Sequence, residues 1–245
     1  MRLLLGLLLS MSLLFSCGKE ENCFQSAGEK VNTSIALPPF TGIVLQDNIH
    51  LEVTDSPQYS VELSYFKNLV DGIDFSIEDS ILFLDNRNKC RWLKSADKPK
   101  LRIEMPLSQL RSFKHLGTED LKITGDISSE EFLFEMRDNA AEVHFKFTGN
   151  NLYIAQHTGS NKLVVEGNAN YLALFNAGQG LSEFSRLRTS FVDVSNVSVA
   201  RIWVHPTDQL IVKNYGLGEV NYCPDVANKQ VENFGGGKIS ACLAQ

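Results

Sequence analysis

The chain has 245 residues, of which 43% are hydrophobic and 21% charged, so it can bury a sizeable core. This composition excludes an intrinsically disordered chain. The formal net charge of −6 argues against a nucleic-acid partner, because such binding depends on basic side chains that neutralise phosphates.

The beginning of the chain has the organisation of a secretory signal peptide. Arg2 supplies the positive charge, and the apolar run that follows is too short to span a bilayer. The run ends in Leu-Phe-Ser-Cys at 14–17, which resembles the lipobox of bacterial lipoproteins, where the cysteine is diacylated and becomes the first residue. We therefore predict a signal peptide over 1–16, a lipid on Cys17 and a polar tether over 17–34, with the acyl chains as a membrane anchor. The alternative is an ordinary secretory signal with a cysteine nearby.

The residues behind this cysteine predict where the protein is displayed. Lys19, Glu20 and Glu21 form a pattern that resembles the surface-export signal of Bacteroidota lipoproteins. We predict an outer membrane lipoprotein exposed on the cell surface. The alternative is a simple polar tether on a protein that faces the periplasm.

Four further cysteines, Cys23, Cys90, Cys223 and Cys242, form an even set in an oxidising compartment. They allow two disulfides in three connectivities. A Cys223–Cys242 bond would close a short C-terminal loop and leave Cys23 to pair with Cys90. No Cys-x-x-Cys spacing occurs, and the five histidines show no short ligand spacing, so we predict no metal and no cofactor.

The segment 35–109 contains short alternating stretches bounded by turn residues. This pattern is typical of strands, and it predicts an antiparallel N-terminal sheet. The stretches cover 49–53, 59–63, 75–77, 81–84 and 101–105.

A repeat of about twenty residues runs through 110–224, and each unit is a turn followed by an alternating strand. In the strand around Val143, alternate apolar residues point to one side and polar residues to the other. Two interleaved strand series on one period predict an all-β solenoid, with a β-sandwich as the alternative. We expect the tail 225–245 to cap its last rung. One series begins at Leu121, Val143, Leu163, Leu181, Ala200 and Val220, and the other at Phe132, Leu152, Tyr171, Phe191 and Leu210.

Basic and aromatic residues supply candidate ligand contacts. A basic stretch over 87–102 could hold an anionic glycan or lipopolysaccharide, although it could also be a solvated loop. Tyr153 and Trp203 occupy outward strand positions, where they could stack on sugar rings or simply stabilise the solenoid face. The candidate contacts are Arg87, Lys89, Arg91, Trp92 and Trp203.

Over 35–224 the sequence resembles the GIN family of autotransporter adhesin head domains of Bacteroidota. The resemblance rests on Phe-Thr-Gly-Ile at 40–43, the strands at 81–84 and 101–105, and the glycine-containing rung corners. The Ser-Gly-Ser-Gly corners of the family have drifted here, for example to Tyr-Gly-Leu-Gly-Glu at 215–219. The resemblance implies a single-stranded right-handed β-helix and a cell-surface role, and it supplies no active site.

The function predicted from the sequence is a non-catalytic surface module for adhesion, with a glycan or protein ligand. One alternative is a structural scaffold lipoprotein of the envelope. Another is a polysaccharide lyase or hydrolase, for which Glu135, Arg137 and Asp138 would stack with His157 one rung later. These four residues could also be ordinary solvated side chains on an outer face. We predict no enzyme activity.

Overall fold

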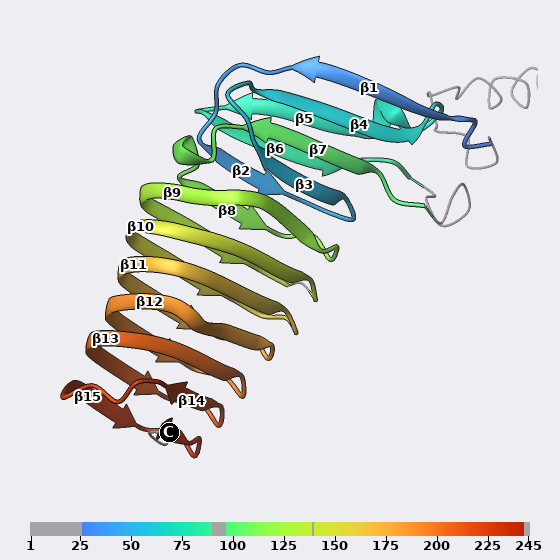
Figure 1. Cartoon of the computed structure of the whole chain (residues 1–245). Helices are drawn as coiled ribbons and strands as arrows, with labels where there is room; N and C mark the ends of the chain where they lie inside the picture. The colour runs from blue at the N-terminus through green and yellow to red at the C-terminus, as the bar shows by residue number, and fades with distance from the viewer. Residues whose placement is uncertain (1–25, 90–96, 139, 243–245) are drawn as a thin grey trace, which may run out of the picture.

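The computed structural model of the protein describes residues 26–89, 97–138 and 140–242. Within these ranges the regular elements are strands, apart from two 3-10 turns at Val70–Gly72 and Leu107–Gln109. The strands coil into a tall solenoid whose rungs are stacked one on the next (Figure 1). The predicted all-β solenoid is therefore confirmed.

Five long, bent strands form the body of the solenoid. Each pairs with the next in parallel and nearly in register over most of its length. Because each strand bends, it contributes a first limb before the bend and a second limb after it. The strands are β9 (Leu121–Met136), β10 (Glu142–Gln156), β11 (Lys162–Asn176), β12 (Leu181–Asn196) and β13 (Arg201–Asn214).

The core lies between the two limbs. In β10, Phe145 on the first limb and Leu152 and Ile154 on the second are at most 2% exposed. The Phe145 ring meets Phe134 of the preceding rung with 5.1 Å between ring centroids. Alternate side chains therefore fill the interior, as the sequence pattern predicts, and the others form the outer faces.

The register corrects two positions of the predicted strand series. Leu172 and Val192 are the residues that follow Leu152 in the interior column, and they are buried. Tyr171 and Phe191, which the sequence pattern placed at the start of the second series, point outward instead. Aromatic side chains are common in cores, so the sequence pattern took Tyr171 and Phe191 as interior residues. The interior positions are the next residue in each strand.

A column of asparagine side chains runs along the corner where each second limb ends, with the first three members buried and Asn233, the last one, exposed. The Asn176 Nδ2 donates to the Asn196 Oδ1 at 2.9 Å, and the Asn196 Nδ2 donates to the Asn214 Oδ1 at 2.8 Å. The Asn214 Nδ2 donates to the Asn233 Oδ1 at 3.2 Å. We call Asn176, Asn196, Asn214 and Asn233 the asparagine ladder. It links buried amides across successive rungs and fixes their register, although the Asn176 Oδ1 itself has no hydrogen-bond partner within the described part of the chain.

Two further rungs lie in the N-terminal half, and they are stacked out of sequence order. β2 (Gly42–Leu45) pairs in parallel with both β6 (Ile81–Asn86) and β8 (Ser112–His115). β3 (His50–Asp55) likewise pairs in parallel with β7 (Lys100–Met105) and with β9. The expected antiparallel sheet is thus only part of this region, because four of the strands β1 to β7 continue the solenoid.

Antiparallel strands close the N-terminal end. β5 (Ile73–Glu78) covers the edge of β6, and β4 (Ser60–Phe66) covers the edge of β7. β1 (Lys30–Ala36) adds outside β4 and forms the edge of that side (Figure 1). These three strands confirm the antiparallel pairing expected for this part of the chain, and they shield the interior of the first rungs from solvent.

The solenoid continues to Ala241, beyond the boundary expected at residue 224. β14 (Glu219–Tyr222) pairs with the first limb of β13, and β15 (Asn228–Asn233) pairs with its second limb. β16 (Ile239–Ala241) adds to β14, where a Cys223–Cys242 disulfide joins the two with 5.2 Å between Cα atoms. The tail therefore forms a last rung, and the disulfide is one of the pairings that the sequence left open.

We expect Asn196→Ala to lower the free energy of unfolding by about 2 kcal/mol, because the buried Asn214 Oδ1 loses the amide that donates to it and Asn176 loses one of its acceptors. Urea unfolding followed by circular dichroism measures the change. The matched control is Asn170→Ala, which removes an exposed amide bonded to Asn150 at 2.9 Å and should cost less than about 0.5 kcal/mol. Equal losses for the two variants would show that the ladder does not stabilise the stack.

Candidate binding groove

A groove opens on the outer face of the sheet where the N-terminal strands meet the solenoid. It consists of two adjoining hollows of about 640 and 320 Å³, which share His50, Ser64 and Lys100. We call this surface the junction groove. The larger hollow is also lined by Asn32, Leu51, Glu52, Glu62, Leu101, Arg102, Asp120 and Lys122, and the smaller by Lys30, Tyr65, Phe66, Asp97 and Lys98.

Strand register builds the floor of the groove from segments that are far apart in the chain. Ser64, Lys100 and His50 lie side by side on β4, β7 and β3. One step along the strands, Arg102 lies between Glu62 and Glu52. Because alternate residues of a strand share a face, Lys100 and Arg102 both point away from the core.

Some charges in the groove are paired and others are not. The Lys122 Nζ lies 2.8 Å from the Glu52 Oε1, and this hydrogen bond holds the pKa of Glu52 below its ordinary value. A hydrogen bond from Lys30 at 2.7 Å likewise lowers the pKa of Asp97. Among the described residues, Lys100 and Arg102 form no ion pair within 4 Å. Two cations on one strand therefore face solvent inside the groove.

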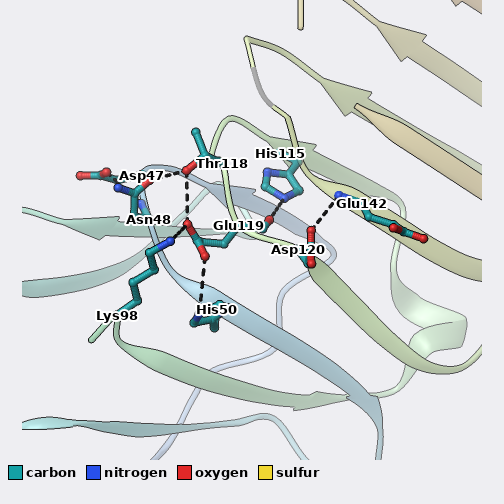
Figure 2. Close-up of polar contacts among 9 residues, drawn as sticks. All are labelled: Asp47, Asn48, His50, Lys98, His115, Thr118, Glu119, Asp120 and Glu142. Carbon is teal, nitrogen blue, oxygen red and sulfur yellow. Dashed lines mark hydrogen bonds and ion pairs between the residues drawn. The ribbon is translucent and has the colours of Figure 1, made fainter. Parts of the chain in front are cut away.

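A buried carboxylate underlies the smaller hollow. The side chain of Glu119 is only 9% exposed, and it pairs with Lys98 and with the His50 Nε2, the latter at 3.4 Å (Figure 2). Thr118 beside it donates to the Asn48 Oδ1 at 2.6 Å. Glu119 thus fixes the positions of two basic side chains at the rim.

His115 shapes the turn that presents Glu119. The Gly117 N–H donates to the His115 Nδ1 at 3.1 Å, so the Nε2 carries the proton and donates to the Glu119 carbonyl at 2.9 Å (Figure 2). Burial lowers the pKa of His115, although the hydrogen bond to Glu119 opposes this shift. The ring is therefore a neutral structural element rather than an exposed acid or base.

The structure brings only part of the predicted basic stretch into the groove. Lys98, Lys100 and Arg102 line it, whereas Arg87 is held by Asp74 at 2.5 Å and Asp85 at 3.5 Å. Lys89 and Trp203 do not line the groove, and Trp203 lies outward on the first limb of β13. Arg91 and Trp92 lie outside the described residues, as do the predicted signal peptide, Cys17, Cys23 and Cys90.

Sequence reasoning missed His50, Lys30 and Glu119 as members of one site. From the sequence, Glu119 could be recognised only as an acidic residue at a corner between two strands. His50 and Lys30 come from strands that no local motif connects to residues 98–102. Their juxtaposition depends on β7 lying between β4 and β3, which spacing in the sequence does not reveal.

The cluster considered for catalysis does assemble on the second limb of the first rungs. The Glu135 Oε1 lies 2.9 Å from Arg137 and 3.2 Å from His157, and the Oε2 lies 3.4 Å from Lys114. Burial favours a higher pKa for Glu135, but Arg137 and Lys114 outweigh it and hold the pKa below its ordinary value. Asp138 bonds to Thr158 instead. A carboxylate kept ionised in this way is poorly suited to protonate a leaving group.

Metal-binding clusters and membrane-spanning helices are absent from the described residues. In the described ranges, no group of three or more His, Cys, Asp or Glu side chains is arranged to hold a metal ion. The same ranges contain no helix long and apolar enough to cross a membrane. The site defined by this structure is an open, charged groove on a solenoid.

This architecture is a β-solenoid with an open groove on one face, and the sequence match agrees with it. The family described as "Putative auto-transporter adhesin, head GIN domain" matches residues 39–225. The chain belongs to this family. Membership in an adhesin family points to a cell-surface protein. No functionally curated protein matches the sequence.

Solved structures share the fold. A "putative adhesin" from Bacteroides fragilis NCTC 9343 is 22% identical with a TM-score of 0.76, over 87% of this chain and 97% of that one. A "putative adhesin" from Parabacteroides merdae ATCC 43184 is 16% identical with a TM-score of 0.62, over 88% and 98%. A "putative lipid binding protein" from Parabacteroides distasonis ATCC 8503 is 15% identical with a TM-score of 0.63, also over 88% and 98%.

Proposed function

We propose that the protein is an adhesion module, anchored to the outer membrane by a lipid on Cys17 and displayed on the cell surface, which binds acidic glycans in the junction groove without catalysis. The lipobox-like sequence and the Lys-Glu-Glu pattern behind it support the anchor and the display. Membership in an adhesin family supports the adhesive role.

A local excess of basic side chains in the smaller hollow of an otherwise acidic protein supports the binding of acidic glycans. The net charge of the chain is −6, yet the smaller hollow gathers Lys30, Lys98, Lys100 and His50 against the single lining carboxylate Asp97. Lys30 and Lys98 are engaged by Asp97 and Glu119, which leaves Lys100 to meet an anion. Carboxylate or sulfate groups on a sugar chain are the matching chemistry.

The ion-paired state of Glu135 supports the absence of catalysis. Cleavage of a glycosidic bond by a pair of carboxyl groups needs one that is protonated at the start of the reaction. The cations around Glu135 favour its ionised form. The cluster of Glu135, Arg137 and His157 is therefore better explained as a structural ion-pair network.

We expect Lys100→Glu to reduce affinity for acidic oligosaccharides at least about tenfold, because it replaces the unpaired cation of the hollow with a repelling charge. Titration calorimetry with polygalacturonate and heparin hexasaccharides measures the effect. Lys213→Glu, on the second limb of β13, is the matched control for the change in net charge and should retain binding. Equal losses of affinity in both variants, or no binding by the native protein, would show that the junction groove does not bind acidic glycans.

Cell fractionation tests the anchor and the display separately. On intact cells, added protease should digest the native protein, and detergent phase partition should place it with the lipoproteins. Cys17→Ser should leave the membrane fraction, because an unacylated chain has no apolar anchor. Protection of the native protein until the outer membrane is opened would instead place it on the periplasmic side.

A further inference from the structure

A second surface, on the second limbs of β9 to β12, carries a group of outward aromatic and aliphatic side chains. Leu133 is 43% exposed, Phe191 41% and Phe175 38%. Tyr153 and Tyr171 lie among them, with 6.1 Å between their ring centroids. We call these five residues the aromatic platform. It belongs to a different set of strand limbs from the junction groove.

Small side chains separate the rings of the platform. Ala173 lies opposite Tyr153 on one neighbouring strand and opposite Asp193 on the other. Along its own strand it stands between Tyr171 and Phe175, whose side chains share its face. Tyr153 meets Tyr171 edge-on, and the Phe175 ring meets His157 at a tilt of 56° with 5.7 Å between centroids. Neither contact is a face-to-face stack, so part of each ring stays available to a ligand.

A polar hollow of about 640 Å³ adjoins the platform. It is lined mainly by neutral amides and hydroxyls, among them Asn150 and Asn170, joined by a 2.9 Å hydrogen bond. Asn170 immediately precedes Tyr171 in β11, so the hollow lies beside the platform along that strand. Arg111, the cation of the hollow, already donates to the Ser108 carbonyl and the Ser129 Oγ at 2.7 and 2.8 Å. Glu130 adds one carboxylate to the lining, and the other hydrogen-bonding side chains there are uncharged amides and hydroxyls.

The charge on the platform favours a neutral ligand over an acidic one. Among the described residues, Asp193 has no ion pair, and its carboxylate can accept hydrogen bonds from hydroxyl groups while it repels an anion. Burial, the charge of Asp193 and the nearby Tyr153 raise the pKa of Tyr171. The Tyr171 hydroxyl therefore keeps its proton and can both donate and accept.

The size of the platform argues against a folded protein as the occupant. Four rungs span roughly 14 Å, and the stretch from 171 to 175 spans roughly 13 Å, which together give an area of roughly 200 Å². A stable protein interface buries about 800 Å² on each partner. A short oligosaccharide fits this area, because pyranose rings present an apolar face to an aromatic ring and hydroxyl groups to amides.

We propose that the aromatic platform and the adjoining amide-lined hollow bind a neutral pyranose oligosaccharide. Sugar rings stack on Tyr153 and Phe175, and hydroxyl groups bond to Asp193, Asn150 and Asn170. This site is independent of the acidic-glycan site proposed for the junction groove, and either one can exist without the other.

Titration calorimetry with four neutral hexasaccharides tests the proposal: cellohexaose, mannohexaose, maltohexaose and chitohexaose. At least one should bind, and saturation-transfer NMR should place its ring C–H protons against the protein. Tyr153→Ala combined with Phe175→Ala should weaken that binding at least about tenfold. Asn170→Ala, an exposed substitution chosen to spare the fold, should weaken it as well.

Two control variants separate the sites. Trp203→Ala removes an outward aromatic ring from the first limb and should leave neutral-sugar binding unchanged. Lys100→Glu should also leave it unchanged, even if it abolishes binding of acidic sugars. The proposal fails if none of the four sugars binds or if the Tyr153/Phe175 variant binds as tightly as the native protein. The proposal would also be overturned if the native protein dimerises in sedimentation velocity and the Tyr153/Phe175 variant does not. The platform would then be a self-association surface.

Discussion

The rungs of this solenoid stack in parallel and in register, with about twenty residues per rung, and this stacking determines which side chains are buried. A shift of one residue between rungs would turn every inward side chain toward solvent. Backbone hydrogen bonds hold the spacing between rungs, and the asparagine ladder adds a side-chain link from Asn176 to Asn233 that prescribes the register. At one corner, an added Cβ on Gly180 would lie 1.4 Å from the Asn161 carbonyl oxygen, so only glycine fits there.

The sequence revealed the solenoid because most of its rungs are consecutive in the chain. A fixed period places Val143 against Leu163 without any knowledge of distant contacts. The N-terminal rungs were not found this way, because Gly42 pairs with Ser112 and with Ile81, and no repeat length connects these residues. Tyr171 and Phe191 were assigned one residue too early, since the pattern of apolar residues there is continuous and alternation alone leaves two registers open.

Both proposed binding surfaces are consequences of stacking rather than of local motifs. In the junction groove, Lys30, His50 and Lys100 become neighbours only because β7 lies between β4 and β3. On the opposite limbs, Tyr153, Tyr171 and Phe191 come from three successive rungs and form a surface because their register is shared. Composition could indicate a basic stretch and outward aromatics, but the partners that surround them required the sheet order.

The interior residues and the outward residues of the solenoid have separate roles. The interior and its polar ladder set the shape, whereas outward positions are free to carry charges or rings on different faces. The antiparallel strands β1, β4 and β5 close the N-terminal end, and the disulfide between Cys223 and Cys242 holds the last rung at the other end. Ligand chemistry can therefore change without disturbing the core, which separates the stability of the fold from its binding function.

Removal of one complete rung tests whether the register of the solenoid is set by whole rungs. Residues 177–196 span one rung, so their deletion joins Asn176 to residue 197 and should bring Asn176 against Asn214 in the ladder. We expect this shortened protein to fold and to unfold cooperatively in urea. Deletion of residues 177–186, half a rung, should abolish cooperative unfolding because the limbs no longer align. Equal behaviour of the two deletions would contradict a register set by whole rungs.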